Sequence, residues 1–451
     1  MKRYLLLFAA CLPFIAMAQN EAEPLETVYQ KKAFELFSQV AEDDTDNMCF
    51  SPLSVQMVMS MVQNGAAGNT LSQMQEALGT TGYSNDEVNA FNQKLEETIT
   101  YRPEYSYNPN MSWWTEEQQR ELYDYNYPLC EMANGIWTRP GTTWHEQFLQ
   151  TMRDCYKAGA GSVDFTTQEG IDEINGWVSE KTHKLIPKVF DTPLLPSVAM
   201  VLADALYFSG KWSTPFSPSK TQPGIFHNTD GTSVQTNMMR MQANQRISKT
   251  DIFRTLTLFY GVGDFSMTIF LPTEGIHLPS LTYDDWKQVL DEEEKFTYVD
   301  LQMPTFVVED KYELNEVLKR MGMVDAFSDY ADFSNMSDEL LSINEVFQCS
   351  KIAVDEKGTE AAAVTVALAV NGMSEEKEEF NIDRPFYFTI EHRKTGSVLF
   401  VGRVSQLQGT AAVAPLTLEK YQGTIHDLQG RRLNAIPQKG AYIKNGKKYI
   451  K

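Results

Sequence analysis

Hydrophobic and polar positions follow two different periods along this chain. In the first half, apolar residues recur every three or four positions, as on one face of a helix. Later, short apolar and β-branched runs predominate, which is typical of strands. Helices are predicted over 25–40, after Ser51-Pro52, from Gln73–Leu78 onward and over Gly170–Leu185. Strands are predicted over Asn47–Phe50, Met200–Phe208, Phe265–Leu271, Thr297–Met303, Glu345–Val354, Phe386–Glu391 and Val398–Val404. Helices followed by strands indicate an α+β fold.

The segment Asp355–Phe380 differs from both patterns. Gly358 supplies a hinge, and no large side chain follows until Leu368. With a period of two, one face is small throughout: Thr359, Ala361, Ala363, Thr365, Ala367 and Ala369. An alanine-rich helix is disfavoured by the β-branched residues, which leaves an ordinary strand or a strand that enters a nearly filled space. The small face favours insertion, because large side chains would clash with a packed core.

Residues 101–127 form an aromatic and acidic stretch. Its aromatic residues are Tyr101, Tyr105, Tyr107, Trp113, Trp114, Tyr123, Tyr125 and Tyr127. One interpretation is a surface insertion that packs its own rings. The other is a binding site for a partner protein, since exposed Tyr and Trp are enriched at interfaces.

The first 18 residues have the pattern of a secretory signal peptide. Lys2 and Arg3 precede the apolar run Tyr4–Pro13, and Ala16-Met17-Ala18 is a small-x-small cleavage site. A lipoprotein signal ending at Cys11 is the less favoured alternative. No other stretch reaches the length of a membrane span. The sequence therefore predicts a secreted chain without a transmembrane segment.

Composition and charge narrow the possible functions. The chain has 451 residues and a net charge of -21, which argues against nucleic acid or heparin-like polyanions as partners. Length alone favours two or three domains. Neither the six His residues nor the cysteines show metal-ligand spacing, and nucleophile-elbow, phosphate-loop and dinucleotide motifs are absent. We therefore expect a protein that is not an enzyme and has no metal or cofactor. The four cysteines beyond the signal are expected to be small buried hydrophobes: Cys49, Cys130, Cys155 and Cys349.

A series of short motifs then appears in order along the chain. They are Ser51-Pro52-x-Ser54, Asn175-x-Trp177, the run Asp204–Trp212, Pro304-x-Phe306, Ala331–Ser334, the hinge Glu356-x-Gly358-Thr359-Glu360-Ala361-Ala362-Ala363, Arg384–Phe386 and Phe400-x-Gly402-Arg403-Val404. Each motif is weak alone, but the ordered set is specific, and residues 25–407 resemble a serpin. The resemblance implies one α+β domain with a large, mainly antiparallel central sheet, two smaller sheets, eight or nine helices and an exposed reactive loop.

The resemblance also implies a function. Such a chain is a monomeric suicide inhibitor that forms a covalent 1:1 complex with an endopeptidase. The alternative is a non-inhibitory member that acts as a protease substrate, binding protein or carrier; the small hinge favours inhibition. The family's spacing places the reactive bond within Gly372, Met373 and Ser374, with Met373 preferred as the recognised residue. Serine proteases of the elastase, chymotrypsin or subtilisin type are the expected targets, and a cysteine protease is possible.

The resemblance further implies a gate at Trp212 and a latch under the opening sheet, made of Ser51, Ser54, Asn134, Asp204 and Gln348. Asp204 and Gln348 replace the family's usual Asn and His. Because an ionised carboxylate only accepts and an amide donates, we expect the Gln348 amide to donate to Asp204, with Ser51 or Ser54 donating as well. Thr305 replaces a Lys that faces the hinge acid Glu356 in some members, so that partner is missing.

The last residues differ in composition from the rest. From Gly409 onward there are eight Lys or Arg and two Asp or Glu. Residues 408–415 are predicted to be a linker and 416–451 a small β-hairpin tail, since Asn445-Gly446 is a strong hairpin turn signal. The tail resembles those of exported Bacteroidetes proteins, some of which are sorting signals; a small β cap without a sorting role is the alternative.

Overall fold

The computed structural model describes residues 22–42, 46–111, 114–196, 198–359, 377–409, 425–426, 432–433, 441–444 and 447–450. The chain forms two compact units, Met1–Gln408 and Gly409–Lys451. The predicted signal peptide and most of the predicted linker lie outside the described residues. Among the helices that are described, none is long and apolar enough to cross a membrane.

The helices of the first unit gather mainly in its N-terminal half. The described residues contain α1 (Leu25–Ala41), α2 (Pro52–Gln63), α3 (Gly68–Leu78), α4 (Asn85–Ile99), α5 (Glu116–Asn126), α6 (Glu146–Tyr156), α7 (Gln168–Lys181), α8 (Tyr283–Asp291), α9 (Asn315–Arg320) and two 3-10 turns, Pro218–Lys220 and Asp325–Phe327. Capping side chains and a proline fix where some of these helices begin. Ser51 accepts a bond from the Ser54 N–H, and Pro52 occupies the first position of α2. Ser84 and Glu87 form a capping box on α4.

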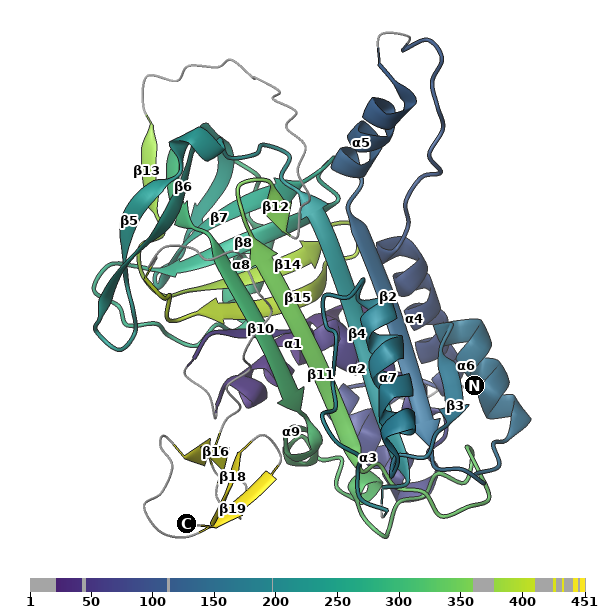
Figure 1. The fold of residues 1–451 in the computed structure, drawn as a ribbon. Coiled ribbons are helices and arrows are strands. Elements are labelled where there is room, and N and C mark those ends of the chain that lie inside the picture. The colour runs from purple at the N-terminus through teal and green to yellow at the C-terminus, as the bar shows by residue number, and fades with distance from the viewer. Residues whose placement is uncertain are drawn as a thin grey trace, which may run out of the picture. The chain divides into compact units, whose positions relative to one another are not determined.

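A six-stranded sheet positions the candidate site. Its order is β10-β11-β12-β4-β2-β3, with β10 (Phe306–Glu313), β11 (Glu345–Val354), β12 (Gly358–Thr359), β4 (Met200–Lys211), β2 (Leu129–Thr138) and β3 (Gly159–Ser162). Helix α7 lies across one face of this sheet, and α2 lies on the other side (Figure 1). Alternate residues of β4 face the two sides: Val201 packs in the cluster beneath α7, and Leu202 packs in the core that includes α2.

The second sheet has nine strands and runs β1-β15-β14-β8-β7-β6-β9-β13, with β5 paired to β6. Its strands are β1 (Met48–Phe50), β5 (Gln222–His227), β6 (Ser233–Lys249), β7 (Phe253–Tyr260), β8 (Phe265–Pro272), β9 (Phe296–Pro304), β13 (Glu378–Asn381), β14 (Phe386–His392) and β15 (Ser397–Val404). The α+β class predicted from the sequence is confirmed. The two smaller sheets expected from the family are hydrogen-bonded into one, because β6 pairs with β5 near one end and with β7 near the other.

The C-terminal unit is a small sheet of its own. It contains β16 (Ile425–His426), β17 (Arg432–Leu433), β18 (Ala441–Lys444) and β19 (Lys447–Ile450), in the order β17-β16-β18-β19. Strands β18 and β19 are antiparallel, with Lys444 opposite Lys447 on either side of Asn445-Gly446. The bounds predicted for the tail stay a prediction.

Candidate functional site

The hinge segment enters the six-stranded sheet as the short strand β12. Thr359 pairs with Val354 of β11 on one side and with Gly210 of β4 on the other, antiparallel in both cases. Gly358 lies so close to β4 that a Cβ added to it would be 2.0 Å from the Gly210 carbonyl oxygen. A side chain at position 358 would therefore push the hinge out of the sheet.

Below β12 the strands β11 and β4 meet directly, so the sheet has the shape of a fork. Their parallel register runs from Glu345 opposite Val201 to Gln348 opposite Asp204, where it ends. By Gly210, β4 pairs with β12 instead. The Gln348–Asp204 pair is therefore the last pair in the register before the two strands diverge, and it is the first that a strand entering further between them would have to break.

Trp212 lies at the mouth of this fork and is 1% exposed. Its backbone N–H donates to the Lys357 carbonyl at 2.8 Å, and its indole Nε1–H donates to the Asp355 carbonyl at 3.0 Å. The indole stacks on the Tyr260 ring with centroids 4.4 Å apart and an angle of 19° between the planes. The predicted gate residue is thus bonded to the hinge at Lys357 and to the residue just before the hinge, Asp355.

Two further contacts hold the hinge from the side of the second sheet. The hydroxyls of Thr359 and Tyr260 are 2.6 Å apart, and Thr359 is fully buried. The Thr221 hydroxyl donates to the Glu356 carboxylate at 2.6 Å. The hinge acid therefore has a hydroxyl partner in place of the lysine that Thr305 replaces. Sequence reasoning missed Tyr260 and Thr221, since nothing local in the sequence connects them to the hinge.

The five predicted latch residues are all buried around the base of the fork. Asn134 of β2, Asp204 of β4 and Gln348 of β11 are register partners on adjacent strands. Asp204 shares its face of β4 with Leu202 and Leu206, whose clusters contain α2 residues. The remaining two latch residues, Ser51 and Ser54, lie at the start of α2.

The prediction that the Gln348 amide donates to Asp204 is wrong. The Gln348 Nε2–H donates to the backbone carbonyl of Ser51 at 2.8 Å rather than to Asp204. Ser51 Oγ accepts from the Ser54 N–H as the helix cap, at 3.3 Å. Neither Asp204 carboxylate oxygen has a hydrogen-bond partner among the described residues, and the same is true of Asn134 Oδ1 and Gln348 Oε1. The Gln348 N–H that we expected to bond to the Asp204 carboxylate is therefore bonded to the turn before α2 instead.

Burial raises the pKa of the Asp204 carboxyl to about 7. The Ser54 hydroxyl is near enough to oppose this rise, although no hydrogen bond of good geometry joins the two. The neutral acid carries a proton that can be donated to a neighbouring acceptor, whereas the carboxylate cannot donate. The neutral form therefore suits a site that holds buried acceptors without partners.

The other predicted site residues fall outside the described residues. These are the hinge positions Glu360, Ala361, Ala362 and Ala363 and the predicted reactive bond at Gly372, Met373 and Ser374. The four cysteines Cys49, Cys130, Cys155 and Cys349 are free thiols, and all but Cys155 are buried. Within the described residues no cluster of His, Cys, Asp or Glu side chains is arranged to hold a metal ion.

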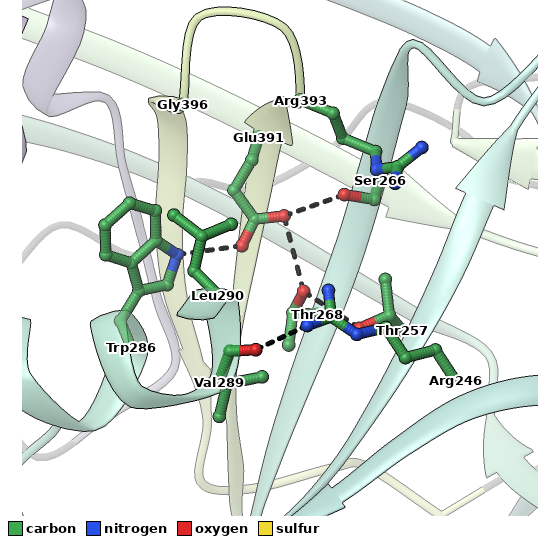
Figure 2. Close-up of a pocket in the computed structure, with 10 residues that line it drawn as sticks. All are labelled: Arg246, Thr257, Ser266, Thr268, Trp286, Val289, Leu290, Glu391, Arg393 and Gly396. Atoms are coloured by element: carbon green, nitrogen blue, oxygen red, sulfur yellow. Dashed lines mark hydrogen bonds between the residues drawn. The ribbon is translucent and has the colours of Figure 1, made fainter. Parts of the chain in front are cut away.

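A second polar cluster lies between α8 and the nine-stranded sheet (Figure 2). The buried Glu391 carboxylate accepts from the Trp286 indole at 3.1 Å and from the Ser266 hydroxyl at 3.1 Å. Arg246 and Arg393 also line the cavity, whose volume is about 30 Å³. A space of this size holds roughly two water molecules.

Known proteins similar to this chain share its fold over most of its length. The model of the serpin family, described as serine protease inhibitor, matches residues 28–407. Serpin B6 of Pongo abelii is 31% identical over 392 residues, which cover 83% of this chain and 96% of that protein. The native thermophilic serpin tengpin has a TM-score of 0.73 at 28% identity, covering 86% of this chain and 96% of its own. Thyroxine-binding globulin in complex with thyroxine gives the same TM-score at 24% identity, with 85% and 99% coverage, and shares the fold.

Proposed function

The chain belongs to the serpin family, and we propose that it is a secreted inhibitor that traps an endopeptidase by inserting its cleaved reactive loop into the six-stranded sheet. The observation that carries this proposal is β12. Both of its residues pair with β4, and Thr359 also pairs with β11; the sequence that follows offers a small-residue face. The fork thus provides a start for the strand, and the loop has side chains that fit between packed strands.

The proposed reaction begins as ordinary proteolysis. The serine oxygen of the protease bonds to the carbonyl carbon of Met373, and the nitrogen of Ser374 leaves as a new, protonated amino terminus. The cleaved loop is then free to continue β12 downward and to carry the ester-linked protease with it. About fourteen residues gain ladder bonds on both edges, at roughly 0.5–1.5 kcal/mol each. The uncleaved fold is then a kinetically trapped state.

Protease specificity is proposed from the loop sequence. Met373 fits the apolar pocket of elastase-, chymotrypsin- or subtilisin-like enzymes, and no Lys or Arg lies between Lys357 and Lys377. Sequencing the N-terminus of the released C-terminal fragment tests the assignment. A fragment that starts at Ser374 supports Met373, and a start beyond Glu376 contradicts it.

The decisive experiment is a panel of elastase-, chymotrypsin-, subtilisin- and papain-like proteases, each incubated with the protein and analysed on denaturing gels. We expect a stable band at the summed mass with at least one enzyme. Clean cleavage without such a band in every case would favour the alternative, a non-inhibitory protein that is a substrate or carrier. The cavity at Glu391 offers little to a carrier role, because about 30 Å³ is far below the roughly 300–1,000 Å³ of small-molecule sites.

Export is the remaining part of the proposal. Residues 1–18 are proposed to be removed as a signal peptide, and the basic C-terminal unit to be a tail of the Bacteroidetes type. Mass spectrometry of the mature protein tests the first point, with Gln19 expected at the N-terminus. A lipid on Cys11 would contradict it. Deletion of 416–451 tests the second, since a sorting tail is needed for surface delivery and a structural cap is not.

A further inference from the structure

The aromatic insertion is attached to the fold beside the gate. Helix α5, at the end of the insertion, stands beyond the ends of β4 and β2, near β12 (Figure 1). The Tyr125 side chain near the end of α5 is 5% exposed. Its hydroxyl lies 2.8 Å from the Trp212 carbonyl and 3.2 Å from the Ser213 carbonyl. A phenol has one proton to donate, so the shorter contact with Trp212 is the principal bond.

This bond completes the fixation of Trp212. The N–H of Trp212 donates to the Lys357 carbonyl of the hinge, and its own carbonyl accepts from Tyr125. The two bonds engage the peptide groups on either side of one residue and so restrict its backbone dihedrals. The direction of the Trp212 indole depends on these dihedrals, and the indole bonds to Asp355 and stacks on Tyr260.

Asn126, the residue after Tyr125, holds the backbone next to Tyr260, the ring on which Trp212 stacks. The carbonyl of Asn126 accepts from the Val262 N–H at 2.9 Å. A Cβ added to Gly261 would be 2.2 Å from the same carbonyl oxygen, so only glycine allows this approach. Gly261 and Val262 follow directly after Tyr260, whose hydroxyl contacts Thr359. The end of α5 thus contacts both backbone segments that carry the aromatic pair around the hinge.

We propose that Tyr125 is a positioning residue for strand insertion: through Trp212 it holds the mouth of the fork in the geometry that keeps Gly358–Thr359 paired with β4. The proposal rests on the proposed function, because insertion is its subject. Once the loop is cleaved, insertion competes with hydrolysis of the ester. If Trp212 is held in place, β12 stays paired with β4 and can extend without first re-forming that pairing. This favours trapping over release of active protease.

The test compares Tyr125→Phe with wild type and with Tyr123→Phe. Tyr123 is the matched control, because its hydroxyl donates to the Pro103 carbonyl within the insertion itself. For each protein we would measure the number of inhibitor molecules consumed per protease trapped and the rate constant for total loop attack. Loss of one hydrogen bond is expected to shift the partition toward cleavage by about fivefold in Tyr125→Phe. The attack rate should stay unchanged in both variants.

Hydrogen exchange at the Trp212 backbone amide provides a second readout that needs no protease. Faster exchange in Tyr125→Phe than in Tyr123→Phe is expected. A wild type that forms complexes, combined with the same partition and the same exchange in all three proteins, overturns this inference alone. A wild type that every protease cleaves without a complex overturns the proposed function and this inference together. A global loss of stability would speed exchange throughout the six-stranded sheet, and that result would also contradict a positioning role.

Discussion

Replacing Asp204 by Asn should make the base of the fork insensitive to pH. In the folded chain the carboxyl has a pKa of about 7, raised from 3.8 by burial. The neutral acid is the form that the closed sheet accommodates. The amide of Asn is neutral at every pH and has N–H groups to offer to Asn134 Oδ1 or Gln348 Oε1, both of which have no partner among the described residues.

The direction of the effect follows from proton linkage. Because folding raises the pKa of Asp204, its contribution to stability is fully present below about pH 3.8 and is lost as the pH rises to about 7. A difference of about three pH units corresponds to about 4 kcal/mol. Between about pH 5 and pH 8 the wild type should therefore lose about 3 kcal/mol relative to Asp204→Asn. At the higher pH the variant should also convert more slowly to inserted or polymeric forms.

The assay is the free energy of unfolding in urea, measured for both proteins across this pH range. The assay needs a control for titration of Glu345, because burial and the charge of Glu313 raise the pKa of its carboxyl to about 7 as well. Helix α2 carries no charged residue, while Asp310 of β10 lies on the same face and accepts from the Cys49 N–H at 2.8 Å. The difference between wild type and Asp204→Asn should persist in a Glu345→Gln background. Parallel pH profiles for the two proteins would refute the reasoning.

Three further substitutions test the fork. Thr359→Arg should turn the inhibitor into a substrate, since Thr359 is fully buried against Tyr260; denaturing gels should show cleavage without complex. Gln348→Ala removes the 2.8 Å bond to the buried Ser51 carbonyl, which keeps only the longer bond from the Val55 N–H at 3.5 Å, so urea unfolding should show a loss of about 0.5–1.5 kcal/mol. Trp212→Phe removes the indole bond to the Asp355 carbonyl just before the hinge, and more inhibitor molecules should be consumed per protease trapped, as titration would measure.

The fold and the residues of the hinge could be predicted because their signals are local. The small side chains after Gly358 and the ordered motifs around them are visible in the sequence, and the structure places Glu356, Gly358 and Thr359 beside Trp212. The contacts that hold the hinge were not predictable. Thr359 and Tyr260 are 99 residues apart, and their meeting depends on how two sheets pack. The same is true of Tyr125, whose aromatic neighbours in sequence indicate a surface and not a gate contact.

The latch shows that complementary side chains are not enough to predict which groups form a hydrogen bond. Asp204 and Gln348 were correctly expected to lie together, and they are register partners. The amide nevertheless donates to a backbone carbonyl, because the turn that leads into α2 presents Ser51 to the same space. A sequence identifies which side chains can donate, but backbone groups compete for every donor, and their positions are known only once the chain is folded.

The antiparallel register of β12 determines which residues of β4 and β11 each later residue of an inserted loop would pair with. Thr359 is opposite Gly210 on one side and Val354 on the other. Six residues further along, the same register brings Thr365 between Asp204 and Gln348, on their face of the sheet. Its hydroxyl would then be placed to donate to the Asp204 carboxylate, whose oxygens have no hydrogen-bond partner among the described residues. If the loop inserts in this register, the polar residues at the base of the fork and the pairing of β12 would favour the same depth and alignment of the incoming strand.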